Sequence, residues 1–217
     1  MSRLRVAVLI SGRGSNMSAL IDAMKPASTP AEIVAVISNR PDAAGLVRAR
    51  NADVATAIVD HRPYGKDRAA FEDALTSELA ARDVEFICLA GFMRLFTPDF
   101  VKRWYGRMLN IHPSLLPLFK GLDPHGQALA AGVKLTGATV HFVTPETDAG
   151  PIVAQGAISV MAGDTPESLA ERVLTVEHRI YPLALRLVAE GRVRIVDNHC
   201  EIDGARTASG MLISPDA

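Results

Sequence analysis

Hydrophobic residues alternate over the first 90 positions between short continuous runs and wider, helix-like spacing. Apolar runs at 6–10 and 86–90 are typical of parallel strands buried on both faces, and weaker runs occur at 33–38 and 55–59. Between these runs, apolar residues three or four positions apart predict helices: Met17, Leu20, Ile21 and Met24, then Phe71, Leu75 and Leu79. The alternating order over residues 5–90 predicts an α/β fold with a doubly wound, mostly parallel, Rossmann-like sheet.

The second half of the chain predicts antiparallel additions to the same sheet. Residues 108–111 form a strand pattern, and a loop rich in Pro and Gly follows over 113–126. Residues 137–144 alternate between apolar and other side chains, and 152–160 continue in an extended pattern. Two such segments in sequence suit antiparallel pairing at one edge of the sheet.

A long amphipathic helix is expected after this region. Asp164 and Glu167 are the expected capping box, and Pro182 is expected to kink the helix. The apolar stripe consists of Leu169, Val173, Val176, Ile180 and Leu187. One sheet implies one domain over residues 1–204, and residues 205–217 are expected to form a flexible tail.

Composition and charge narrow the class of protein. The 217 residues carry 23 Lys and Arg against 24 Asp and Glu, which argues against a general nucleic-acid binder. Cys88 and Cys200 cannot build a disulfide framework, and their spacing does not resemble a zinc site. The apolar run 6–10 is too short for a signal peptide or a membrane span. We therefore expect a soluble, cytoplasmic protein with no metal and no membrane partner.

A glycine-rich segment, Ser11-Gly12-Arg13-Gly14-Ser15-Asn16, joins the first strand to the first helix. Its glycines allow a tight turn that brings N–H groups close to an anion at the helix N-terminus, and Asn16 is expected to cap that helix. A dinucleotide fingerprint would need a third glycine at Met17, and a triphosphate loop would need Gly-Lys-Ser/Thr. The segment therefore favours a small phosphate monoester, although many loops of this type only turn the chain.

Asn110 and His112 are the strongest candidates for chemistry. Residues two apart on a strand share a face, so these side chains project together from the strand 108–111. A carboxamide beside an imidazole suits stabilisation of an oxyanion and handling of a proton, while a structural histidine is the alternative. Asp148 lies in a turn after 137–144, where it either caps the turn or orients His112.

Four segments together resemble the phosphoribosylglycinamide formyltransferase family over residues 5–200. They are Ile10–Asn16, Leu89–Arg94, the block Asn110-Ile111-His112-Pro113-Ser114-Leu115-Leu116-Pro117, and His141–Pro151. The Asn-x-His block marks the wider formyltransferase family, and Ser-Gly-x-Gly-Ser-Asn distinguishes the enzymes that act on 5′-phosphoribosylglycinamide (GAR). The resemblance implies transfer of a formyl group from 10-formyltetrahydrofolate to the GAR amine in purine biosynthesis, by a monomer or homodimer.

The resemblance also implies roles for individual residues. Residues 5–90 would form the GAR-binding half and 91–204 the catalytic and folate-binding half. Asn110 and protonated His112 would stabilise the oxyanion, with Asp148 supporting His112. GAR would contact Gly14, Ser15, Asn16 and Glu177, and the folate would contact Arg68, Met93, Arg94, Leu95, Phe96, Asn110, Val143 and Asp148. The structural alternatives are a flanking carboxylate for Glu177, core side chains for Met93 and Leu95, and a solvated helix face for Arg68.

Two positions depart from the family pattern, which usually has His where this chain has Asp123 and Thr136. Asp123 would place a carboxylate near the folate. Three other functions remain open. A methionyl-tRNA formyltransferase is expected to carry a further C-terminal domain and a basic surface, and a formyltetrahydrofolate hydrolase an N-terminal regulatory domain. A non-catalytic phosphoribosyl-binding module would leave Asn110, His112 and Asp148 without a role.

Overall fold

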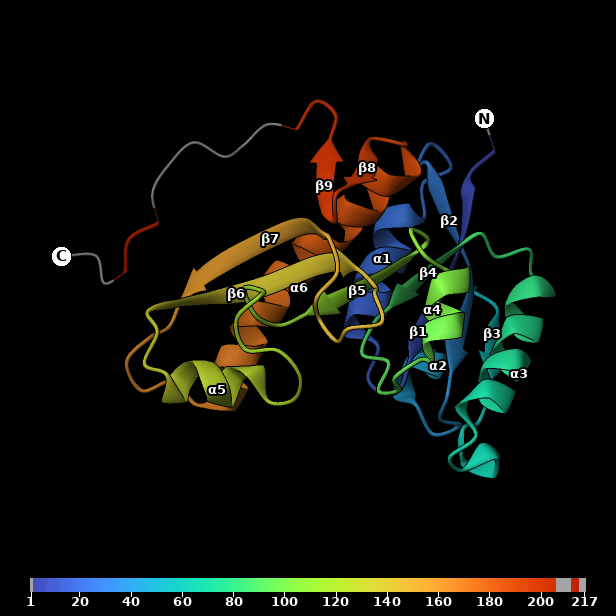
Figure 1. The fold of residues 1–217 in the computed structure, drawn as a ribbon, viewed down its shortest axis with the longest axis horizontal. Coiled ribbons are helices and arrows are strands. Elements are labelled where there is room, and N and C mark those ends of the chain that lie inside the picture. Colours follow the sequence, from blue (N-terminus) through green and yellow to red (C-terminus); the bar gives the residue numbers. More distant parts are fainter. Residues whose placement is uncertain (1, 206–211, 215–217) are drawn as a thin grey trace.

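A seven-stranded sheet forms the centre of the computed structural model, which describes residues 2–205 and 212–214 (Figure 1). Its strand order is β3-β2-β1-β4-β5-β6-β7. Strands β1 to β5 pair in parallel, and β6 and β7 add antiparallel pairs at one edge. The bounds are β1 Leu4–Ile10, β2 Ala31–Ser38, β3 Thr56–Ile58, β4 Phe86–Leu89, β5 Met108–His112, β6 Leu135–Phe142 and β7 Ile152–Ser159. The predicted α/β class and mostly parallel sheet are confirmed.

Helices cover both faces of this sheet, which explains why its central strands are continuously apolar. Val6, Val8 and Ile10 pack with α1, α2 and α6, whereas Ala7 and Leu9 pack with α3 and α4 on the opposite face (Figure 1). The helices are α1 Ser15–Met24, α2 Ala44–Asn51, α3 Arg68–Ala80, α4 Pro98–Arg103, α5 Pro124–Ala130 and α6 Pro166–Ala189, with a 3-10 turn η1 at Arg62–Tyr64.

Several local predictions were wrong. The capping box of α6 is formed by Thr165 and Ser168, because Asp164 instead accepts hydrogen bonds from Met161 N and from the Ser168 hydroxyl. The loop expected over 113–126 ends earlier, at the start of α5. The chain also forms a second, two-stranded sheet from β8 (Val193–Val196) and β9 (His199–Ile202), which was not predicted.

The long C-terminal helix contains Pro182 within its span and remains one helix from Pro166 to Ala189. Most of the predicted tail, residues 206–211 and 215–217, lies outside the described residues. Among the residues that are described, no helix is long and apolar enough to span a membrane.

Candidate active site

The order in which successive strands join the sheet reverses between β1 and β4. The candidate site lies at the carboxyl ends of these two strands. From β1 the chain continues to β2 on one side, and from β4 it continues to β5 on the other. Such a switch point opens a crevice in which ligands bind in open α/β sheets. The two loops that leave these strands are joined by a hydrogen bond from Ser11 N to Gly91 O (3.1 Å).

Gly14 shapes the first of these loops. It is the N-cap residue of α1 and has φ +74°, a left-handed conformation that favours glycine. A Cβ atom at this position would also lie 2.9 Å from the Cα of Gly45, at the start of α2. The loop therefore needs glycine both for its backbone conformation and for its close contact with α2.

Asn16 does not cap α1, contrary to prediction. The N-cap residue makes no side-chain hydrogen bond, and Asn16 lies inside the first helical turn with its side chain buried. Its amide donates a hydrogen bond to the carboxylate of Glu177 on α6. Glu177 is itself buried rather than flanking, and burial raises the pKa of its carboxyl group above the ordinary value despite the Asn16 hydrogen bond.

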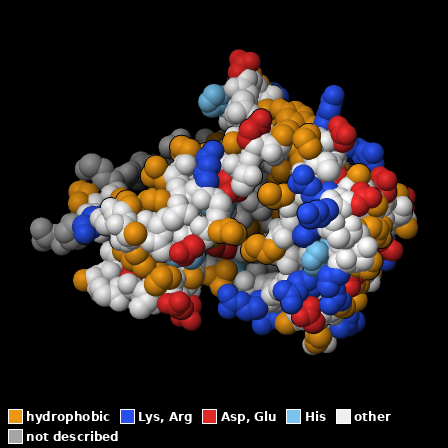
Figure 2. Space-filling view, turned by 60° about the horizontal axis from the view of Figure 1, so that its bottom comes forward, with side chains coloured by type: hydrophobic (Ala, Val, Ile, Leu, Met, Phe, Trp, Pro, Cys, Tyr) orange, Lys and Arg blue, Asp and Glu red, His pale blue; other side chains and the backbone are white. Residues whose placement is uncertain are grey.

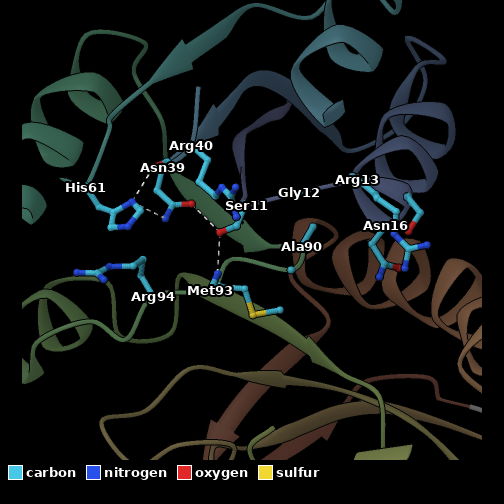
Figure 3. A pocket seen from close by; sticks show the side chains of 13 residues that line it. Ser11, Gly12, Arg13, Asn16, Asn39, Arg40, His61, Ala90, Met93 and Arg94 are labelled. Carbon is cyan, nitrogen blue, oxygen red and sulfur yellow. Dashed lines mark hydrogen bonds between the residues drawn. The ribbon is translucent and has the colours of Figure 1, made fainter. Parts of the chain in front are cut away.

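The first cavity, of about 400 Å³, opens beside this loop (Figure 3). Ser11 lies at its centre, where its hydroxyl donates to Asn39 Oδ1 (2.6 Å) and accepts from Met93 N (2.8 Å). Asn39 in turn contacts His61, with 3.2 Å between Nδ2 and the ring Nδ1. The lining residues are Ser11, Gly12, Arg13, Gly14, Ser15, Asn16, Asn39, Arg40, His61, Ala90, Gly91, Met93 and Arg94. Backbone N–H groups and cationic side chains at one cavity suit an anionic ligand.

A second cavity, of about 360 Å³, adjoins the first and shares Arg94 with it. It lies between the segment after β4 and the segment after β6, and is lined by Arg68, Leu89, Phe92, Arg94, Leu95, Phe96, Pro98, Val101, Asn110, His141, Val143, Thr144, Pro145, Glu146, Thr147 and Asp148. Basic side chains gather beside a hollow in the space-filling view (Figure 2). Apolar walls with a few polar and cationic groups suit a flat organic acid.

Asn110 and Asp148 line the second cavity, and His112 lies behind them in contact with Asp148. Asn110 and His112 project from β5, and Asp148 lies in the turn between β6 and β7. His112 Nδ1 is 3.4 Å from Asp148 Oδ2, and His112 Nε2 donates to the main-chain oxygen of Phe119 (2.8 Å). Gly121 N also donates to Asp148 Oδ2 (2.9 Å). With its Nε2 hydrogen held by Phe119, an imidazolium form of His112 would direct its second N–H toward a carboxylate.

Most of the residues implied by the resemblance line one of the two cavities. Gly14, Ser15 and Asn16 line the first, whereas Glu177 reaches it through Asn16. Met93 lies at the first cavity rather than with the rest of the folate set at the second. The side chains of Met93 and Leu95 are 71% and 65% exposed, which excludes the core alternative for both.

Sequence reasoning missed other residues of the site. Asn39, Arg40 and His61 line the first cavity, and the contact of His141 with Asn110 in the second was not predicted either. The usable signal for Asn39 and Arg40 was their place directly after β2, at the same edge of the sheet as the glycine-rich loop. Asp123, one of the two departures, caps α5 by accepting from Gly126 N (3.1 Å), and Thr136, the other, is buried in β6.

Comparisons with known proteins show the family of this chain. The family model described as formyl transferase matches residues 4–185. The phosphoribosylglycinamide formyltransferase of Escherichia coli is 44% identical over 94% of this chain and 95% of its own length. The chain belongs to the phosphoribosylglycinamide formyltransferase family. A solved structure of glycinamide ribonucleotide transformylase 1 from Symbiobacterium toebii is similar, with TM-score 0.89, 48% identity, and 92% and 94% of the two chains covered.

Longer relatives contain a region similar to this formyltransferase chain. The trifunctional purine biosynthetic protein adenosine-3 of Bos taurus is 53% identical over 90% of this chain, which spans only 19% of that protein. The chain therefore corresponds to about a fifth of the length of these trifunctional relatives.

Proposed function

We propose that this chain transfers the formyl group of 10-formyltetrahydrofolate to the amine of GAR in purine biosynthesis, giving formyl-GAR and tetrahydrofolate. The observation that carries the proposal is that Asn110 and Asp148 line one of two adjoining cavities, with His112 in contact with Asp148. One cavity suits a phosphate monoester and the other a flat organic acid. A transfer between two substrates needs two such sites with chemical groups beside them.

GAR is assigned to the first cavity. Its phosphate would accept hydrogen bonds from the backbone N–H groups of the loop that contains Gly14 and from Ser15, at the N-terminus of α1. Asn16 and Glu177 form a buried polar pair beside this position, which suits contacts with hydroxyl groups of the ribose. This placement directs the glycinamide amine away from the loop and toward Asn110.

The folate is assigned to the second cavity. Arg68 and Arg94 supply positive charge for the carboxylates of the glutamate part. Leu95, Phe96 and Val143 give apolar contacts for the ring system, and Met93 lines the first cavity next to Arg94, which both cavities share. Asn110 and Asp148 then lie beside the formyl group.

The chemistry begins with attack of the neutral GAR amine on the formyl carbon, which forms a C–N bond and places negative charge on the formyl oxygen. The Asn110 amide donates a hydrogen bond to that oxygen. The imidazolium of His112, whose two N–H groups face Phe119 O and Asp148, stabilises the oxygen through its positive charge, while Asp148 stabilises the imidazolium. The attacking nitrogen then loses a proton, N10 of the folate gains one, and the bond between N10 and the formyl carbon breaks. This proton transfer would pass through His112 or an ordered water.

A formyl-transfer assay tests the proposal directly. Purified chain is mixed with GAR and 10-formyltetrahydrofolate, and tetrahydrofolate and formyl-GAR are measured separately. We expect both products in equal amounts, and a fall in kcat of about 100-fold or more in Asp148→Asn. The matched control is Asp197→Asn, which removes one carboxylate from the turn between β8 and β9.

The other functions predict different results in the same assay. Release of tetrahydrofolate without GAR would indicate a hydrolase. Binding of GAR with no release of tetrahydrofolate would indicate a binding module. Either result would contradict the proposed transfer reaction.

A further inference from the structure

His141 and Asn110 face each other across the antiparallel pair of β5 and β6. They are register partners, so their side chains emerge side by side on the sheet face that also carries His112. His141 Nε2 lies 3.2 Å from Asn110 Nδ2, and His141 is only 2% exposed. The roles described so far leave this buried imidazole unused.

The hydrogen-bond partners of His141 determine which ring nitrogen carries the hydrogen. Nδ1 lies 2.9 Å from the main-chain oxygen of Phe142, and because a carbonyl oxygen can only accept, Nδ1 must donate. The neutral ring then has a lone pair on Nε2. Only the nitrogen of the Asn110 amide, and not its oxygen, complements that lone pair.

A cationic ring would reverse this arrangement, because its Nε2–H would attract the amide oxygen. Burial opposes that state and holds the pKa of His141 below its ordinary value. The Phe142 carbonyl and Asp148, whose Oδ1 is 3.8 Å from Nε2, act in the opposite direction, whereas His112 and Lys120 add to the effect of burial. The neutral form is therefore the one that matches the observed contact with Asn110.

We propose that His141 is a positioning residue, which as a neutral acceptor holds the Asn110 amide with its nitrogen toward the ring. The second N–H of the same amide then remains for the oxygen of the formyl group. With the amide rotated, its oxygen would take that place and repel the developing oxyanion. This inference rests on the function proposed above.

Two substitutions of His141 distinguish the effect of losing the hydrogen-bond acceptor from the effect of losing the ring itself. His141→Leu removes the acceptor, and we expect kcat to fall about 10- to 100-fold with both KM values within about twofold. His141→Gln places an amide oxygen near the position of Nε2 and should recover most of that loss. In an Asn110→Ala background, His141→Leu should change kcat less than about twofold, since its target is gone. The proposal would be overturned if kcat fell equally in His141→Leu and His141→Gln. It would also be overturned if His141→Leu lowered kcat as much in the Asn110→Ala background as in the wild type.

The ring state can be measured without any variant. Nitrogen NMR of the full chain labelled at histidine should show His141 neutral near pH 7, with its hydrogen on Nδ1. A hydrogen on Nε2, or a cationic ring, would overturn the role of His141 even in an active protein. Absence of formyl transfer in the wild type would overturn the proposed function instead, so the two failures are distinguishable.

Discussion

Asn16 at the start of α1 donates a hydrogen bond to Glu177 in the middle of α6, although 161 positions separate them in sequence. Both side chains are buried. The contact joins the loop that contains Gly14 to the long C-terminal helix and places a carboxyl group beside the first cavity.

Glu177 should make stability depend on pH. Burial raises the pKa of this group in the folded state above its ordinary value of 4.5, so the folded state holds the proton more tightly than the unfolded state. Its contribution to the free energy of unfolding is complete below pH 4.5 and is lost as pH rises through the folded-state pKa. Glu177→Gln should therefore be more stable relative to wild type at pH 8 than at pH 5, as measured by urea unfolding.

The matched control for this prediction is Glu171→Gln on the exposed side of the same helix. It should shift the stability by the same small amount at both pH values. An identical pH dependence in wild type and Glu177→Gln would show that Glu177 does not titrate with a raised pKa.

Gly14→Ala should destabilise the fold more than an alanine at another left-handed glycine. Gly132 has φ +66° with no atom within 4 Å of an added Cβ. The free energy of unfolding should therefore fall by only about 1–2 kcal/mol in Gly132→Ala. In Gly14→Ala the added Cβ also collides with Gly45. We expect its free energy of unfolding to fall by about 1–3 kcal/mol more than in Gly132→Ala, and GAR to bind more weakly. Chemical denaturation and titration with GAR measure both effects, and equal losses in the two variants would contradict this account.

Glu72 should control the formyl donor site without touching the donor. This buried carboxylate on α3 accepts from Thr97 N (2.6 Å) and from the Thr97 hydroxyl, and so fixes the segment that carries Arg94 and Leu95. We expect Glu72→Gln to raise KM for the formyl donor about tenfold, with KM for GAR unchanged. Asp73→Asn, on the exposed side of α3, is the control, and steady-state kinetics with each substrate varied is the measurement.

The two thiols should resist alkylation in the folded protein. Burial raises the pKa of Cys88 to about 12 and that of Cys200 to about 11, and the thiolate is the reactive form. Neither cysteine should react with iodoacetamide at pH 8 within the time in which both react in urea, as followed by mass spectrometry. Rapid modification of Cys88 in native buffer would show that the core around β4 opens readily.

The α/β class, the glycine-rich loop and the placement of Asn110 and His112 on one strand face could all be predicted from the amino-acid sequence. These features are local, because they depend on the period of apolar residues and on glycines at fixed spacing. The family motifs also lie within short segments. Local periodicity did not identify the true capping box of α6 or the strands β8 and β9, which have only four residues each.

Contacts between residues far apart in the sequence could not be predicted in this way. The partnership of Asn110 with His141 depends on the register of β5 against β6, and that of Asn16 with Glu177 depends on how α1 packs against α6. The contacts of Ser11 with Asn39 and Met93 require the strand order β2-β1-β4. Register, strand order and helix packing are set by burial over the whole chain, so no single segment of the sequence carries them.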